Sequence, residues 1–377
     1  MRPNQPSHPV NEEIASRMIR HGVRLQEYST HQVYQMIGYL NRHVEPDLVE
    51  QLRKYAGQDL TRRRIEAIRE AVGQIVSDGY ERIRELLEQE MLAQGVLEAQ
   101  EVMGILSEGM PVEVSWTMPS VGVLREAVLR EPIAGEFVPD WFARLSLNTQ
   151  QAIQRQIMLG VIEGEGIDTM IRRIVGTRGN QYTDGVMERS RRELEAVVRT
   201  AVAGVSDHVH QEIYQANADV IQAVQWVATL DSRTCVVCGL MDGQTFEIGQ
   251  GPRAPAHWNC RCVRVPVLKS WKQLGLPLKE GATGTRAGTA IPPAEVRRLR
   301  RLGGEDKAQL QRRLDGQPAE SLTYGQWLKR QSRRVQEEVL GPSRAKMFAT
   351  GKLKLEAFVV DRRRVRTLKE LGVKKNA

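Results

Sequence analysis

The 377-residue sequence is poor in aromatic residues and in long apolar runs. Phe, Trp and Tyr make up 5% of it, against 41% for all hydrophobic residues, so aliphatic side chains must form most of the core. No uncharged apolar stretch approaches the roughly 18 residues of a membrane-spanning helix. Residues 1–9 contain no apolar segment of the kind that forms a signal peptide. We therefore expect no membrane partner, and assembly of the protein in a cytoplasm.

The sequence also lacks the short motifs that mark many enzymes. It contains no phosphate-binding glycine loop and no nucleophile elbow. We therefore predict that the protein is not an enzyme, that it has no catalytic residue and no organic cofactor, and that it takes no small-molecule substrate.

Acidic residues are scarce toward the end of the chain. Residues 290–377 hold 22 Lys and Arg against 10 Asp and Glu, a net charge of +12; the other residues hold 32 and 36, a net charge of −4. A basic region of this kind is typical of proteins with a polyanionic partner. Its few aromatic residues do not indicate base stacking. We expect phosphate contacts to double-stranded DNA without sequence preference, the alternative being a solvated helix face.

Cysteine is rare, yet all four cysteines lie within residues 235–262. Cys235 and Cys238 are three residues apart, and so are His257 and Cys260. A pair at this spacing on a tight turn directs two side chains at one centre, as in small zinc sites. Residues 239–256, between the pairs, are enough for one hairpin that brings the second pair back to the first.

Three interpretations of this Cys/His cluster stay open: a structural metal site, which we favour, buried free thiols, and disulfide or redox chemistry. A reducing cytoplasm disfavours disulfides. If a metal is bound, Cys235, Cys238, His257 and Cys260 are its predicted ligands, and four such ligands close a structural zinc site. Cys262, two residues further on, would point to the opposite face of an extended segment and is the alternative ligand.

Helical periodicity dominates the first two thirds of the chain. The longest pattern runs from Leu60 to about Ser107, with glycines at 73, 79 and 95 that predict kinks. Residues 112–116 alternate like a short strand. Asn148 and Asp184 are expected to cap two later helices. Segments 222–230, 245–248 and 261–268 are predicted strands.

These patterns predict an α+β, mostly helical fold. We expect a long N-terminal helical arm (residues 1–110) and a domain (111–275) whose small antiparallel sheet is pinned by the Cys/His cluster. A flexible linker (276–294), rich in Gly, Ala and Thr, is expected to lead to a basic helical C-terminal module (295–377).

The cluster and its surroundings closely resemble the signature of the phage Mu F-like head morphogenesis proteins, minor head proteins of tailed bacteriophages. That signature is a tryptophan strand, Asp-x-Arg-Thr-Cys-x-x-Cys, an Asp-Gly turn and His-x-Asn-Cys-Arg-Cys. This chain carries it at Trp226, Asp231, Arg233, Thr234, Cys235, Cys238, Asp242, Gly243, His257, Asn259, Cys260, Arg261 and Cys262.

The sequence departs from the family pattern at two positions. Trp258 stands where proline is common, and Ala201 stands where an acidic residue is usual. The second departure argues against any catalytic role at position 201. We expect nearby Arg199 to be structural and to lie against the strand layer. The resemblance covers about 123–371 and is strongest over 194–266 and in the C-terminal module from 321 to 371.

The resemblance implies a structural protein of the phage head, at or near the portal vertex, assembled in the host bacterial cytoplasm. Its implied partners are the portal protein and other head proteins, with packaged DNA near the basic tail. The alternative function is a zinc-containing nuclease of the His-Asn-His type. That chemistry needs a histidine base beside a catalytic metal, and His257 alone lies close to the cysteines in sequence.

Overall fold

A computed structural model describes residues 9–276, 286–287, 318–319, 323–360 and 364–372. Most of the expected linker (276–294) and the first part of the basic region lie outside the described residues. The described chain is mostly helical with a small antiparallel sheet beside the Cys/His cluster, which confirms the predicted fold class.

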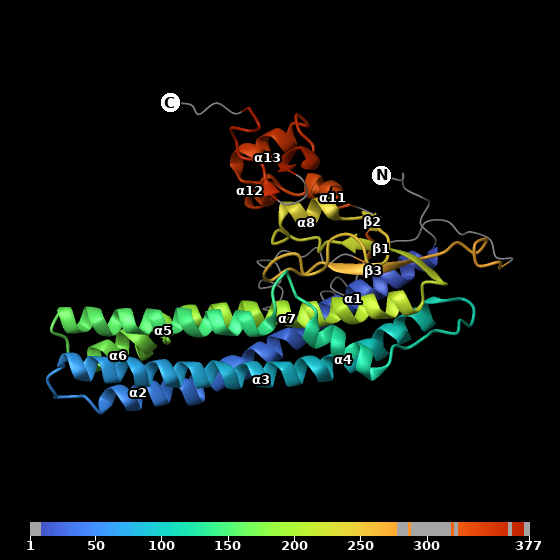
Figure 1. The fold of residues 1–377 in the computed structure, drawn as a ribbon. Coiled ribbons are helices and arrows are strands. Elements are labelled where there is room, and N and C mark those ends of the chain that lie inside the picture. Colours follow the sequence, from blue (N-terminus) through green and yellow to red (C-terminus); the bar gives the residue numbers. More distant parts are fainter. Residues whose placement is uncertain (1–8, 277–285, 288–317, 320–322, 361–363, 373–377) are drawn as a thin grey trace, which may run out of the picture.

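The helices α1 (Pro9–Tyr39), α3 (Arg62–Gly109), α5 (Val138–Ile162) and α7 (Val186–Ala216) pack lengthwise against one another and form one long bundle, the helical layer of the molecule (Figure 1). Shorter helices connect and cover them: η1 (Leu40–Val44), α2 (Glu45–Arg53), α4 (Val121–Arg130), α6 (Ile167–Val175) and η2 (Arg178–Asn180). None of the helices in the described part of the chain combines the length and the apolar character that a membrane crossing needs.

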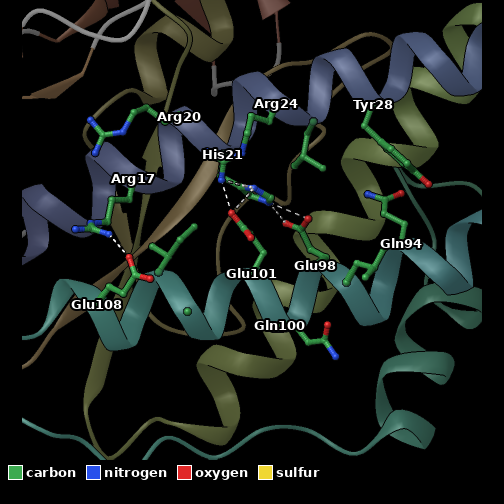
Figure 2. A pocket seen from close by; sticks show the side chains of 14 residues that line it. Arg17, Arg20, His21, Arg24, Tyr28, Gln94, Glu98, Gln100, Glu101 and Glu108 are labelled. Carbon is green, nitrogen blue, oxygen red and sulfur yellow. Dashed lines mark hydrogen bonds and ion pairs between the residues drawn. The ribbon is translucent and has the colours of Figure 1, made fainter.

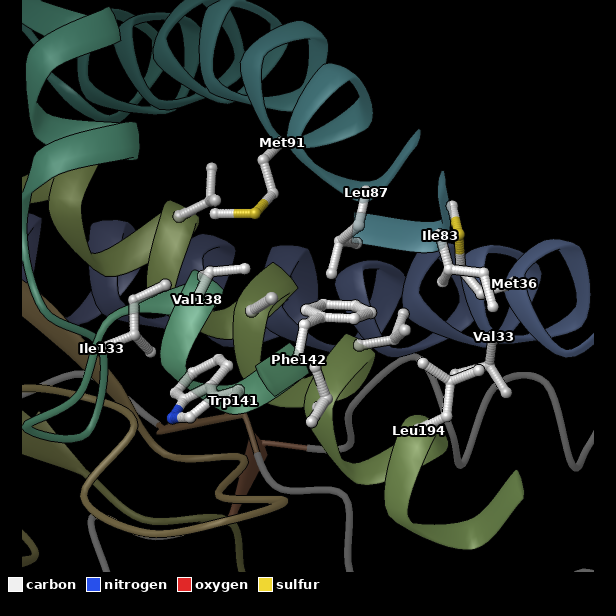
Figure 3. Packing of buried hydrophobic residues seen from close by; sticks show 14 of the residues in the cluster. Val33, Met36, Ile83, Leu87, Met91, Ile133, Val138, Trp141, Phe142 and Leu194 are labelled. Carbon is white, nitrogen blue, oxygen red and sulfur yellow. The ribbon is translucent and has the colours of Figure 1, made fainter. Parts of the chain in front are cut away.

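Aliphatic and aromatic side chains from these helices form one continuous core. Figure 3 shows Trp141 and Phe142 of α5 beside Leu87 and Met91 of α3, with Leu194 of α7 in the same cluster. Because the core is shared, the N-terminal helices pack directly on the helices that carry the sheet.

None of the three glycines breaks the longest helix, since α3 is continuous through all of them. Two of these glycines are sites of close helix approach. A Cβ added at Gly79 would lie 2.4 Å from Val44, and one at Gly95 would lie 2.9 Å from Val128. Glycine therefore serves packing here.

Three local predictions were wrong. Residues 112–116 form no strand. Helix α5 runs through Asn148, because its buried positions continue without a break from Trp141 and Leu145 to Ile153. Helix α7 begins after Gly185, and Asp184 instead accepts hydrogen bonds from the backbone N–H and hydroxyl of Thr177.

The main sheet has the order β2–β1–β3, with β1 (Ile221–Val227) antiparallel to both β2 (Thr245–Phe246) and β3 (Val263–Leu268). Strand β3 lies on α1 and α7. The fully buried Arg264 of β3 donates to both carboxylate oxygens of Asp207 on α7, at 2.6 and 2.8 Å. Burial opposes ionisation of Asp207, but Arg264 and then Arg253 outweigh it and hold the pKa of that carboxyl below its usual range.

A second small core joins the helix α8 (Val236–Met241) to the C-terminal module. Thr323 and Gln326 form a capping box at α11 (Tyr324–Arg330), and Trp327 and Leu328 are buried. The module continues through α12 (Arg333–Leu340), α13 (Pro342–Ala349) and η3 (Leu355–Phe358), with strands β6 (Val359–Val360) and β7 (Arg364–Val365). Strands β4 (Arg286–Ala287) and β5 (Pro318–Ala319) form a separate pair.

Candidate metal centre

The first half of the cluster is built by the loop between β1 and α8. Asp231 accepts hydrogen bonds from the backbone N–H groups of Arg233 and Thr234, both at 3.0 Å, and from the Arg261 guanidinium. These contacts fix the entry to α8. The Cys235 sulfur then caps that helix by accepting from the Cys238 backbone N–H at 3.3 Å. Both sulfur atoms are thereby held at one helix start.

The second half is a tight turn from His257 to Cys260, closed by a backbone hydrogen bond of 3.1 Å between these two residues. Asn259 has a φ of +57°, a left-handed conformation that asparagine tolerates better than most residues. Its backbone N–H donates to the Thr200 hydroxyl of α7 at 3.1 Å. The turn is therefore anchored on the long helix layer.

The two halves converge on one centre. The Nε2 atom of His257 lies 3.4 Å from the Cys235 sulfur and 3.3 Å from the Cys238 sulfur, and the Cys238 and Cys260 sulfurs are 3.8 Å apart. Tetrahedral zinc, with bonds of about 2.3 Å to sulfur and 2.0–2.1 Å to nitrogen, separates two sulfurs by about 3.8 Å and sulfur from nitrogen by about 3.6 Å. The donor set and its spacing fit a zinc ion.

Cys262 departs from the expected geometry. We expected it to point to the opposite face from Cys260, but its sulfur lies within 4.8 Å of the Cys238 and Cys260 sulfurs. The segment is irregular before β3 begins at Val263, so strict strand alternation does not apply to it. The structure thus places five candidate ligands together. They form two groups that share Cys238: one with Cys235 and His257, the other with Cys260 and Cys262.

Histidine 257 is oriented as metal-binding histidines are. Its Nδ1 atom lies 2.9 Å from the Trp258 carbonyl oxygen, which accepts the ring N–H and leaves Nε2 to face the sulfurs. A nuclease base would need that nitrogen for substrate, and here it is directed at Cys235 and Cys238.

The thiols of Cys235 and Cys238 differ in acidity because one donates a hydrogen bond to the other. A hydrogen bond from the Cys238 thiol lowers the pKa of Cys235 to about 4, and the same contact raises the pKa of Cys238. The Cys235 thiolate in turn raises the pKa of His257 to about 11. A bound cation would displace these protons, because cysteine and histidine bind metals in their deprotonated forms.

The surroundings of the cluster differ from the sequence-based expectations in one respect. Residues 239–256 contain no hairpin of their own, since β2 pairs with β1 instead. The hydrogen bonds of Arg199 go to helices: it pairs with Glu195 and donates to the hydroxyls of Ser29 and Thr30 on α1. Asp242 and Gly243 form the expected turn, with a φ of +78° at Gly243.

Sequence reasoning missed a second polar cluster in the helical layer. His21, Glu98 and His210 lie together on α1, α3 and α7, and all three are buried. His208 and His210 lie two residues apart on α7 and face different ways, and only His210 belongs to this cluster. One feature of the sequence could have indicated it. The acidic Glu98 lies at helical spacing from Met91, Gly95 and Val102, which places it on the buried face of the helix.

Residues 151–265 match the family described as phage Mu protein F like protein. The chain contains a phage Mu F-like domain. This is a family of minor head proteins of tailed phages, generally structural. The match includes both halves of the Cys/His cluster, α7, β1, β2 and the start of β3. No curated protein and no solved structure matches the chain.

Proposed function

We propose that this phage Mu F-like protein acts structurally in the head of a tailed phage, at or near the portal vertex. The observation that carries the proposal is the family match over 151–265, which includes the complete cluster. Its partners are the portal protein and other head proteins. It is assembled in the bacterial cytoplasm and remains in the virion, and it catalyses no reaction.

The Cys/His cluster holds one structural zinc ion in this proposal, through Cys235, Cys238, His257 and Cys260. The cluster is surrounded by a small apolar core made of Trp226, Ala228, Met241 and Ala254. A core of this size stabilises little by itself, so a metal that binds only the folded form would supply much of the local stability.

The basic C-terminal module is proposed to touch packaged double-stranded DNA. Lys329, Arg334 and Lys346 are exposed on α11, α12 and α13. Long basic side chains on an exposed surface suit phosphate contacts, which fix no base sequence.

Cross-linking mass spectrometry of purified heads, prepared with and without packaged DNA, tests the location. We expect few copies per head and cross-links to the portal protein in both preparations. Cross-links spread evenly over the major shell protein would contradict the portal location, and absence from heads would contradict the proposal. A plasmid-cleavage assay with added metal, in wild type and His257→Ala, checks the nuclease alternative: metal-dependent cleavage lost in that variant would support it.

A further inference from the structure

Three long helices bring two histidines and one carboxylate together inside the helical layer. His21 of α1 is 7% exposed, Glu98 of α3 is 3% exposed and His210 of α7 is 2% exposed. The Nε2 atom of His21 lies 2.9 Å from each oxygen of Glu98. The Nε2 atom of His210 lies 2.6 Å from Glu98 Oε1. Both imidazoles therefore direct their Nε2 atom at the Oε1 atom of Glu98.

The carboxylate of Glu98 needs a positive charge close to it. Burial opposes its ionisation, yet the hydrogen bonds from His21 and His210 outweigh burial and hold the pKa of Glu98 below its usual range. The nearby Arg24 pairs with Glu101 at the rim instead. A buried carboxylate without a positive charge close to it is costly in a protein interior.

Two nitrogens and one carboxylate oxygen form a recognised set of metal ligands. Zinc and ferrous iron both bind two histidines and one carboxylate, and leave further positions for water. Ligand atoms about 2.0–2.1 Å from one ion lie about 3 Å apart. The Nε2-to-oxygen separations of 2.6 and 2.9 Å are at or below this value, and all three ligand atoms lie within 4.8 Å of one another, so the side chains would have to move slightly apart to admit an ion.

A cavity beside the cluster would give an ion access to it, and neighbouring side chains lie where they can orient His21 and Glu98. A cavity of about 650 Å³ opens beside the cluster, between α1 and α3 (Figure 2). On its wall, Glu101 Oε1 lies 3.9 Å from His21 Nδ1, and Figure 2 shows this carboxylate below the ring. A carboxylate at the second ring nitrogen orients a metal-binding histidine. Ser206 donates to Glu98 Oε1 at 2.6 Å and orients the carboxylate.

We propose that His21, Glu98 and His210 bind one divalent transition-metal ion of the zinc or ferrous class, which fastens α1 to α3 and α7. This site is separate from the Cys/His cluster and does not depend on it. The opposing arrangement is a purely hydrogen-bonded cluster. There His21 keeps its proton on Nε2, and its Nδ1 accepts from Arg24, whose Nη2 is 3.5 Å away. Metal binding puts the proton on Nδ1, facing Glu101.

The test is a titration of the purified full-length protein with Co²⁺, followed by absorption and by metal analysis after dialysis. Cobalt bound to cysteine gives intense sulfur-to-metal charge-transfer absorption, whereas cobalt at the histidine–carboxylate site gives only weak visible bands. We expect one equivalent of the second kind per chain. His210→Gln should abolish it and leave any charge-transfer absorption unchanged.

Two further variants keep the test decisive if His210→Gln fails to fold. Glu101→Gln lies at the exposed rim and should weaken Co²⁺ binding by about 10- to 100-fold, because it removes the negative charge beside His21 Nδ1. His31→Gln changes an exposed histidine on the same helix and should bind as wild type does. Absence of the weak visible bands in wild type, or equal binding by Glu101→Gln and His31→Gln, would overturn the proposal in favour of the hydrogen-bonded cluster.

Discussion

Asn259 shows why the closing half of the cluster has its particular residues. The turn from His257 to Cys260 needs one left-handed residue, and Asn259 supplies it with a φ of +57°. Asparagine adopts this conformation with little strain. Its backbone N–H also reaches Thr200 on α7, so the turn is oriented as well as closed. The position of Asn259 thus sets where His257 and Cys260 point.

Cys238 is the residue whose loss should affect metal binding most. It belongs to both groups of candidate ligands, whichever sulfur is the fourth ligand. We expect Cys238→Ser to lose the bound zinc, about one ion per chain, and to lower the free energy of unfolding by more than about 4 kcal/mol, since structural zinc contributes directly to folding. Elemental analysis and thermal unfolding measure the two effects.

Cys262→Ser is the matched control for that experiment. Cys262 is also buried, with 6% of its surface exposed, but it lies outside the proposed ligand set. We therefore expect this variant to retain zinc. If Cys262→Ser loses zinc while Cys260→Ser keeps it, the fourth ligand is Cys262. If wild type prepared without chelator carries no zinc, the structural-metal proposal itself is wrong.

Among the secondary-structure elements, α8 links the cluster to the C-terminal module. Cys235 caps it, and its Gly239 faces the ring of Tyr324 on α11. The Tyr324 hydroxyl donates to the carbonyl oxygens of Asp231 and Thr234, both at 3.1 Å. The cluster loop and the module are therefore packed as one unit, and the lack of a side chain at Gly239 permits the close approach of the Tyr324 ring.

Gly239→Ala should loosen this contact. A Cβ at that position would lie 2.2 Å from the Tyr324 ring, so the ring must move. Overpacking of this kind costs about 1–3 kcal/mol. We expect faster hydrogen exchange in α11 and a lower unfolding temperature. Gly325→Ala is the control, because its added Cβ would lie 3.7 Å from Leu355, an ordinary contact. Equal exchange in the two variants would contradict the packing described here.

The elements themselves were largely predictable from the sequence. Helical periodicity of the apolar residues predicted the long helices, and the change to an extended pattern after them predicted the three strands. Both patterns are regular because each element buries one face. The outcome at Gly79 and Gly95 was not predictable, since a local signal cannot tell a kink from a close approach to Val44 or Val128. The position of Cys262 was missed for a related reason: alternation holds only inside a strand.

At the scale of the whole molecule, the spacing of residues along the sequence predicted the Cys/His cluster but could not predict the histidine–carboxylate cluster. The first has its ligands within one short stretch of sequence. The second joins residues 21, 98 and 210, and only the packing of α1 and α7 on α3 brings them together. Glu98 alone carried a sequence signal, and its partners depend on tertiary structure.

The whole-molecule charge distribution leads to the last prediction. Residues 290–377 carry a net charge of +12, and the rest of the chain carries −4. We expect DNA binding by this region without sequence preference. Each neutralised phosphate adds about −0.9 to the slope of log affinity against log salt, so about five contacts would lower affinity on the order of 500-fold between 50 and 200 mM salt. A salt titration with two unrelated duplexes measures this.

Deleting the tail is a poor control, because Tyr324, Trp327 and Leu328 are buried in the core shared with α8. Surface substitutions avoid that problem. The triple variant with Lys329, Arg334 and Lys346 changed to Gln should reduce the salt slope by up to about 3, because it removes three exposed cations. The matched control changes three other exposed cations to Gln: Arg53 and Lys54 at the end of α2, and Arg63 at the start of α3. If both triples bind DNA equally, these basic side chains serve a protein partner such as an acidic portal surface.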